Sequence, residues 1–252
     1  MAETSLPRDD LISRIGRAAG RLARTGGTWV LPNVCPACRS QVCLHEQTMC
    51  PACSGRLREL PGPRCPRCGG VVDGPLAVCG ECLAGDPGVW KQAVTVYGYE
   101  GFIRDLIHQM KYQQAVFLVP FMAGKMAESW RRGQCAQPDV ATWVPMHWWR
   151  KTRRGYNQAE LLAREVGRIL DIPARKLVRR KKNSRKQVTL GEVERRENVK
   201  GAFVSRRGRL IADKHVLLID DVFTTGATLR AVTQAISEHA PSHISVLTLA
   251  RG

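Results

Sequence analysis

The stretch VLLIDDVFTTGATL, residues 216–229, constrains the fold of this chain more than any other segment. Its four leading apolar residues, 216–219, predict a central strand that is buried on both faces. Asp220 and Asp221 follow at the carboxyl end of this strand, where open α/β sheets bind their ligands. The segment therefore predicts an α/β fold with a ligand site at that edge of the sheet.

The turn after the two acids has the chemistry of a phosphate site. It consists of Thr224, Thr225, Gly226, Ala227 and Thr228. The following helix offers unpaired N–H groups and the positive end of its dipole, while Gly226 lets the backbone approach a ligand closely. The patterns of Walker loops and of dinucleotide-binding turns are both absent. The alternative, an ordinary strand-turn-helix with a capping Thr, explains neither the paired acids nor the TTG triplet.

This segment resembles the 5-phosphoribosyl 1-diphosphate (PRPP) site of type I phosphoribosyltransferases. The resemblance implies that Asp220 and Asp221 hold the ribose 2′ and 3′ hydroxyls and that the turn holds the 5′-phosphate. It also implies that Mg²⁺ binds together with PRPP and bridges its diphosphate and ribose oxygens. In a catalytic member of the family, a nucleophile would displace diphosphate from C1′ through an oxocarbenium-like state.

A second anion-binding loop is expected because the diphosphate also needs donors. The candidate is VPMHWWRKTRRGYNQ, residues 144–158, in which Pro145 ends a strand and Gly155 permits a tight turn. The residues predicted to bind the diphosphate are Lys111, Arg153, Arg154 and Gly155. The residues predicted to bind nucleic acid are Trp148, Arg150, Lys151, Arg153 and Arg154. Trp148 can stack on a base there, but one of Trp148 and Trp149 can instead belong to the core.

Eight cysteines form four Cys-x-x-Cys pairs. They are Cys35, Cys38, Cys50, Cys53, Cys65, Cys68, Cys79 and Cys82. Four thiolates close a tetrahedral structural zinc site, so the pairs predict two Zn²⁺ ions. A disulfide framework would need an oxidising compartment, and the N-terminus has no apolar signal core. The pairing is open at this point between tandem ribbons in chain order and an interleaved cross-brace.

Together these motifs resemble the ComF family, competence-associated proteins that join a zinc-finger region to a phosphoribosyltransferase-type domain. The resemblance covers about residues 30–251 and includes the 144–158 loop, Lys111-Tyr112, parts of residues 187–203 and the terminal LTLAR. One departure is NSRKQ, residues 183–187, where the family has a Thr and often a Pro before the glutamine. The resemblance implies handling of single-stranded DNA during natural transformation, with a DNA helicase and recombination-loading proteins as partners.

Charge and periodicity define the expected layout of the chain. The formal charge is +17, and residues 150–214 hold 21 Lys/Arg against 7 Asp/Glu, a net +14. This basic region favours polyanions, or is simply a solvated face. We expect an N-terminal helix or tail over 1–27, a double zinc ribbon over 28–86 and a phosphoribosyltransferase-like domain over 89–252. The chain contains no apolar run of about 18 residues, so no membrane span is predicted, and a cytoplasmic location is expected.

Alternating elements predict a mostly parallel sheet with helices on both faces. Strands are expected at 93–99, 140–144, 202–204, 215–220 and 243–249. Helices are expected at 8–25, 102–110, 116–130, 158–170 and 228–239, and a basic loop at 179–200 is long enough to close over a ligand. The preferred function is a DNA-handling protein that binds PRPP or a related phosphosugar. The alternatives are an active phosphoribosyltransferase with an unidentified acceptor and a metal-dependent scaffold that binds only protein partners.

Overall fold

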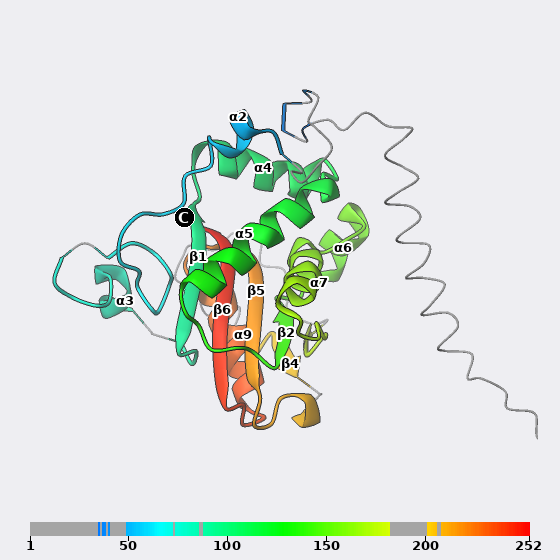
Figure 1. The fold of residues 1–252 in the computed structure, drawn as a ribbon. Helices are drawn as coiled ribbons and strands as arrows, with labels where there is room; N and C mark the ends of the chain where they lie inside the picture. The colour runs from blue at the N-terminus through cyan, green and yellow to red at the C-terminus, as the bar shows by residue number, and fades with distance from the viewer. Residues whose placement is uncertain are drawn as a thin grey trace, which may run out of the picture. The chain divides into compact units, whose positions relative to one another are not determined.

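The structure is a computed structural model that describes residues 35, 37–38, 40, 49–72, 74–85, 88–181, 201–205 and 208–252. Residues 1–53 and 54–252 form two compact units. The predicted helix at 8–25 and residues 182–200 of the predicted basic loop lie outside the described residues. So do Cys43 and His45, which lie between the first two cysteine pairs and could in principle substitute as metal ligands, although packing or solvent exposure is the preferred interpretation. Figure 1 shows the elements in chain order.

A four-stranded parallel sheet forms the centre of the larger unit. Its strand order is β1-β6-β5-β2, and every neighbouring pair is parallel. The strands are β1 (Gln92–Gly98), β2 (Val140–Trp143), β5 (His215–Phe223) and β6 (His243–Arg251). β5 and β6 are almost entirely buried, as expected for central strands covered on both faces. The predicted mostly parallel sheet is confirmed.

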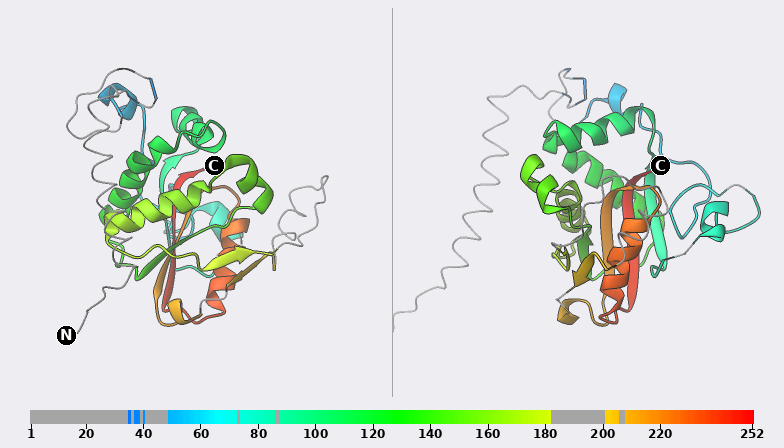
Figure 2. Two further views of the ribbon diagram at one scale, coloured as in Figure 1. Left: turned by 90° about the vertical axis from the view of Figure 1, so that its right-hand side faces the viewer. Right: turned by 180° about the vertical axis from the view of Figure 1, so that it is seen from behind.

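Helices cover both faces of this sheet. The helices in the described part of this unit are α3 (Gly80–Ala84), α4 (Gly101–Tyr112), α5 (Val119–Arg132), α6 (Trp148–Arg154), α7 (Gln158–Leu170) and α9 (Ala227–Ser237). Short 3-10 turns span η2 (Val116–Leu118) and η3 (Gly208–Leu210), and α2 spans Pro51–Ser54. α5 and α7 pack on one face, and α9 lies on the other, as the view from behind shows (Figure 2). Parallel strands joined by crossover helices produce this layering.

Two differences from the sequence prediction affect the site. β5 does not stop at residue 220 but continues to Phe223, because β6 offers pairing partners as far as Arg251. A short antiparallel ribbon of β3 (Val178–Arg180) and β4 (Phe203–Ser205) also brackets residues 182–200, whereas a strand was expected only at 202–204.

Among the described helices, none combines the length and the apolar character that crossing a membrane requires.

Candidate functional site

Two residues that were predicted to bind different parts of one ligand contact each other. Lys111 lies in the last turn of α4, and its Nζ is 3.0 Å from Oδ2 of Asp221 on β5. The two side chains are 19% and 14% exposed. A largely desolvated cation and carboxylate therefore lie together near the carboxyl end of β5, where parallel sheets hold their ligands.

Asp220 occupies a different environment from its neighbour. Successive side chains of a strand alternate between its faces, yet the Asp220 carboxyl lies close enough to Asp221 and Lys111 for both of their charges to act on it. The Asp221 backbone N–H donates to Oδ1 of Asp220 at 2.9 Å. Burial and the adjacent Asp221 carboxylate raise the pKa of Asp220 to about 8, against the opposing effects of that N–H and of Lys111. Asp220 therefore keeps its proton to a higher pH than an ordinary aspartate does, and a cation bound beside it would favour the ionised form.

The predicted phosphate turn joins β5 directly to α9. Gly226 is the N-cap of α9 and has a φ of +71°, a left-handed conformation that favours glycine. A Cβ at this position would lie 2.9 Å from the Phe223 ring. Gly226 has no side chain to cap the helix, and Oγ1 of Thr225 accepts from the Ala227 N–H at 3.5 Å, the outer limit of a hydrogen bond. The geometry suits an anion better than it suits a closed cap.

Arg230 supports this turn, and the sequence interpretation did not include it. It lies one helical turn beyond Gly226, and its guanidinium donates to the Thr225 carbonyl oxygen. Its backbone N–H donates to the Gly226 carbonyl at 2.9 Å. The position of Arg230, four residues after Gly226, could have indicated this role, because positions i and i+4 lie on the same face of a helix.

The predicted diphosphate loop contains a helix, which corrects the expectation of an irregular loop. Residues Trp148–Arg154 form α6 because no glycine or proline interrupts WWRKTRR. The boundaries were predicted correctly: β2 ends before Pro145, Gly155 has a φ of +80°, and Asn157 caps α7. The Asn157 side chain also donates to the Val144 carbonyl at 2.9 Å, which fixes the end of the loop to β2.

This segment is fastened to the end of α4 beside Lys111. The Met110 carbonyl accepts from the Tyr156 hydroxyl and, at 3.4 Å, from Nε2 of Gln158. Cζ of Arg154 lies 4.6 Å from the centre of the Tyr112 ring. Arg154 is thus held at the end of α4 through a cation–π contact with Tyr112, the residue that follows Lys111.

The two tryptophans of α6 are both on the surface. Trp148 and Trp149 are 59% and 55% exposed, and their ring centres are 5.9 Å apart. The expectation that one of them can belong to the core is wrong, because they lie on a short surface helix and not on a strand. Arg153 is exposed on the same helix, while the side chains of Arg150 and Lys151 lie outside the described residues.

The eight paired cysteines form two clusters in chain order. Each cluster has its Sγ atoms within 4.8 Å of one another. A Zn–S bond of about 2.3 Å in tetrahedral geometry separates the sulfurs by about 3.8 Å. The Sγ atoms of Cys38 and Cys50 are 3.6 Å apart, and so are those of Cys68 and Cys79. The clusters fit two structural zinc ions, and the order along the chain is that of tandem ribbons and not of a cross-brace.

The pKa values of the thiols differ within each cluster: hydrogen bonds from Ser40 lower the pKa of Cys38 to about 6, and, against the effect of burial, hydrogen bonds from backbone N–H groups lower the pKa of Cys65 to about 7. Burial and the neighbouring thiols raise the pKa of Cys53 to about 12. Burial raises the pKa of Cys82 to about 11. Several thiolates cannot remain close together without a countercharge, so a divalent cation is the group that would deprotonate all four.

Relatives of known name share most of this chain. Residues 27–83 match the double zinc ribbon domain family, and residues 152–252 match the phosphoribosyl transferase domain family. Competence protein F of Haemophilus influenzae is 34% identical over 181 residues, which are 69% of this chain and 78% of that protein. The chain belongs to the ComF family. Other relatives of this ComF-family protein are DNA utilization protein YhgH of Escherichia coli, 30% identical over 69% of this chain and 77% of its own, and competence protein ComFC of Bacillus subtilis, 24% identical over 69% and 72%.

The fold of the ComF-family chain is that of a type I phosphoribosyltransferase-like domain with an N-terminal double zinc ribbon. Among solved structures, the purine phosphoribosyltransferase of Pyrococcus horikoshii is 22% identical, with 54% of this chain and 73% of that chain covered, at a TM-score of 0.32. The fold assignment rests on the domain families and on the observed sheet.

Proposed function

We propose that this ComF-family protein binds PRPP or a related phosphosugar at the carboxyl end of β5 and binds single-stranded DNA over α6. The contact of Lys111 with Asp221 is the single observation that carries the proposal. It brings a residue assigned to the diphosphate to within 3.0 Å of a residue assigned to the ribose, from two separate elements. The two side chains form an ion pair with each other.

The ligand would occupy named positions around this pair. Thr224 to Thr228 would hold the 5′-phosphate through main-chain N–H groups and hydroxyls. Asp220 and Asp221 would fix the ribose hydroxyls, and Lys111, Arg153, Arg154 and Gly155 would contact the diphosphate. The carboxylates of Asp220 and Asp221 are the hard oxygen donors that Mg²⁺ prefers, and Mg²⁺ bound with PRPP would neutralise charge on the diphosphate.

Single-stranded DNA would lie over α6 and its surroundings. Exposed Trp148 and Trp149 offer faces for base stacking, and Arg153 and Arg154 offer charge for the phosphates. Arg150 and Lys151 belong to the same proposed surface. This activity suits a role in natural competence and DNA uptake, with a DNA helicase and recombination-loading proteins as partners. The reduced thiols needed for both zinc sites favour the cytoplasm as its place of action.

An active phosphoribosyltransferase is the second candidate. It is favoured by the pair of acids beside a turn that suits a phosphate, the arrangement needed to hold a ribosyl group while diphosphate leaves. The acceptor is not identified by any residue of the chain. Release of diphosphate from PRPP with Mg²⁺ tests this candidate.

The two activities separate in one pair of assays. If the protein is an enzyme, Asp221→Asn should abolish diphosphate release and leave the affinity for a labelled oligonucleotide unchanged. An unchanged rate of release would contradict the enzyme assignment. The DNA-binding proposal fails if the oligonucleotide does not bind at low salt, or if its affinity does not depend on salt.

A further inference from the structure

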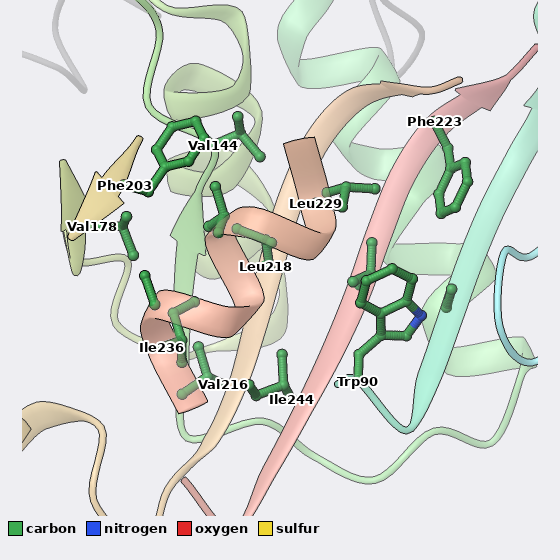
Figure 3. Close-up of a cluster of buried hydrophobic side chains, with 14 of the residues drawn as sticks. Trp90, Val144, Val178, Phe203, Val216, Leu218, Phe223, Leu229, Ile236 and Ile244 are labelled. Atoms are coloured by element: carbon green, nitrogen blue, oxygen red, sulfur yellow. The ribbon is translucent and has the colours of Figure 1, made fainter. Parts of the chain in front are cut away.

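The second cysteine cluster is part of the core that supports the phosphate turn. Cys65 and Cys68 are fully buried and belong to the same hydrophobic cluster as Trp90, Phe223 and Leu229. Figure 3 shows Trp90 and Phe223 in one cluster with Leu229, which projects from α9. The metal site and the turn therefore share one packed interior, in which displacements are transmitted because voids are few.

Arg251 connects a cysteine ligand to the strand that carries the turn. Its Nη1 donates to Sγ of Cys68 at 3.3 Å, and its Nη2 forms an ion pair with Glu81, which lies between Cys79 and Cys82. Arg251 is opposite Phe223 in the register of β5 and β6. Its Cζ lies 5.7 Å from the centre of the Phe223 ring. The Arg251 guanidinium thus contacts Cys68 and Glu81 at the second cysteine cluster and also Phe223, the last residue of β5.

Phe223 contacts both Arg251 and the phosphate turn. It immediately precedes Thr224, and its ring lies within 2.9 Å of the position that a Cβ on Gly226 would occupy. Trp90 packs edge-on against it with ring centres 6.3 Å apart. The indole Nε1 of Trp90 donates to the Arg67 carbonyl at 2.8 Å, inside the Cys65–Cys68 knuckle. Two routes therefore lead from one knuckle to the Phe223 ring.

A polar contact also runs from this knuckle to the strand beside Asp220. The hydroxyl of Thr95 lies 3.1 Å from the Cys68 carbonyl oxygen and 2.7 Å from the hydroxyl of Thr248. Thr248 is opposite Asp220 in the register of β5 and β6. The Cys65–Cys68 segment is therefore linked by contacts to the phosphate turn through Phe223 and, through Thr95 and Thr248, to the position on β6 opposite Asp220.

We propose that Arg251, Phe223 and Trp90 are positioning residues that couple metal binding at Cys65, Cys68, Cys79 and Cys82 to the shape of the phosphate turn. A bound Zn²⁺ would fix the Cys68 sulfur as the acceptor for Arg251 and would hold the knuckle against Trp90. Without the metal, Arg251 and Trp90 lose fixed partners, and the Phe223 ring under Gly226 is released. The inference rests on the proposed function only in treating the turn as the ligand-binding segment.

Hydrogen exchange of the full chain tests this coupling without any ligand. Removal of zinc with a chelator should accelerate exchange of the backbone amides at 224–229 by about tenfold, while amides in the middle of α7 should change by less than about twofold. The coupling is contradicted if the turn does not respond, or if the turn and α7 accelerate equally.

The zinc-loaded variant Arg251→Gln supplies a second test that needs no chelator. It should accelerate exchange at the turn, and zinc removal should then add less acceleration than in the wild type. The matched control is Arg168→Gln, which loses an arginine–glutamate pair on α7 with Glu165 and should behave as the wild type. A turn that exchanges alike in the two variants overturns the proposal.

Calorimetry with PRPP and Mg²⁺ then separates this inference from the proposed function. Zinc-loaded Arg251→Gln should bind about tenfold more weakly than the wild type, and Arg168→Gln should bind as the wild type does. Equal affinity of all three proteins contradicts the coupling. If the wild type does not bind PRPP, the proposed function fails, and hydrogen exchange still decides whether the metal site shapes the turn.

Discussion

The Lys111 ammonium lies 3.0 Å from the Asp221 carboxylate, and it joins the end of α4 to the carboxyl end of β5. The next residue, Tyr112, lies under the guanidinium of Arg154. These contacts place three segments that are distant in the sequence at one edge of the sheet. Under the proposed function, a ligand with two separated phosphoryl groups would contact these cations and carboxylates and the turn at 224–228.

Lys111→Ala tests the importance of this pair. We expect the affinity for PRPP with Mg²⁺ to fall at least about tenfold, or about 1.4 kcal/mol, because the diphosphate loses a cation. The control is Lys125→Ala, which removes a lysine paired at 3.0 Å with Glu128 on the surface of α5. Calorimetry that gives equal losses for the two variants would show that Lys111 has no special role.

Asp220→Asn should change the dependence of stability on pH. The pKa of Asp220 is raised on folding to about 8, so the folded state keeps a proton that the unfolded state releases near pH 4. The wild type therefore loses stability as the pH rises from about 4 to about 8, whereas the neutral asparagine does not titrate. The variant should gain a few degrees in Tm relative to the wild type at pH 8, and this gain should disappear near pH 3.5. A Tm difference that is independent of pH would contradict the raised pKa.

Gly226→Ala should destabilise the turn for two reasons. The left-handed φ costs about 1 kcal/mol for a residue with a Cβ, and the added atom would lie 2.9 Å from the Phe223 ring. Gly62→Ala is the matched control, since Gly62 has a φ of +67° and no atom within 4 Å of the added Cβ. Denaturant unfolding should show the larger loss for Gly226→Ala, and phosphosugar affinity should fall in that variant alone. Equal destabilisation would mean that the Phe223 ring yields without cost.

The double variant Arg153→Ala/Arg154→Ala should weaken binding of single-stranded DNA and reduce its salt dependence. Each phosphate contact contributes about 0.7 to the slope of log K against log salt, so two lost contacts should lower the slope by about 1.4. Arg164→Ala/Arg168→Ala on α7 removes the same charge from residues paired with Glu160 and Glu165. Fluorescence anisotropy at several salt concentrations measures both slopes. If the α7 variant has the same effect, the interaction is only with the net charge of the protein.

Replacing one zinc-binding cysteine in either cluster should lower the zinc content of the chain. Only the replacement in the second cluster should clearly lower the stability of the larger unit. Cys65→Ser introduces an uncoordinated polar group at a fully buried position in the core of that unit, while Cys38 is exposed and belongs to the first unit. We expect the transition of the larger unit to fall by several degrees in Cys65→Ser and to change little in Cys38→Ser. Calorimetric scanning combined with zinc analysis measures both effects. A similar fall in the two variants would contradict the role of the second cluster in the core.

The elements with clear patterns were predictable from the sequence. α7 was expected at 158–170 and has these bounds, because its apolar spacing, Asn157 cap and first acidic turn agree. The two metal sites were predictable because the spacing of Cys-x-x-Cys pairs reflects the geometry of the metal, but the sequence left open which pairs share a site. The α/β order followed from the change of period between strands and helices.

The contacts between distant segments were not predictable from one sequence. Arg251 and Cys68 are 183 residues apart, and neither has a local pattern that indicates the other. α6 was missed because arginines and tryptophans are compatible with both a loop and a helix. The end of β5 was placed too early because its last residues are stabilised by pairing with β6 and not by their own hydrophobicity.

Calorimetric titration of the zinc-loaded full chain with PRPP and Mg²⁺ tests the central claim most directly. The account predicts saturable binding of one PRPP per chain, with the affinity reduced at least about tenfold in both Lys111→Ala and Asp221→Asn. Absence of heat and of any shift in Tm at millimolar PRPP, or equal binding by the wild type and both variants, would contradict the account.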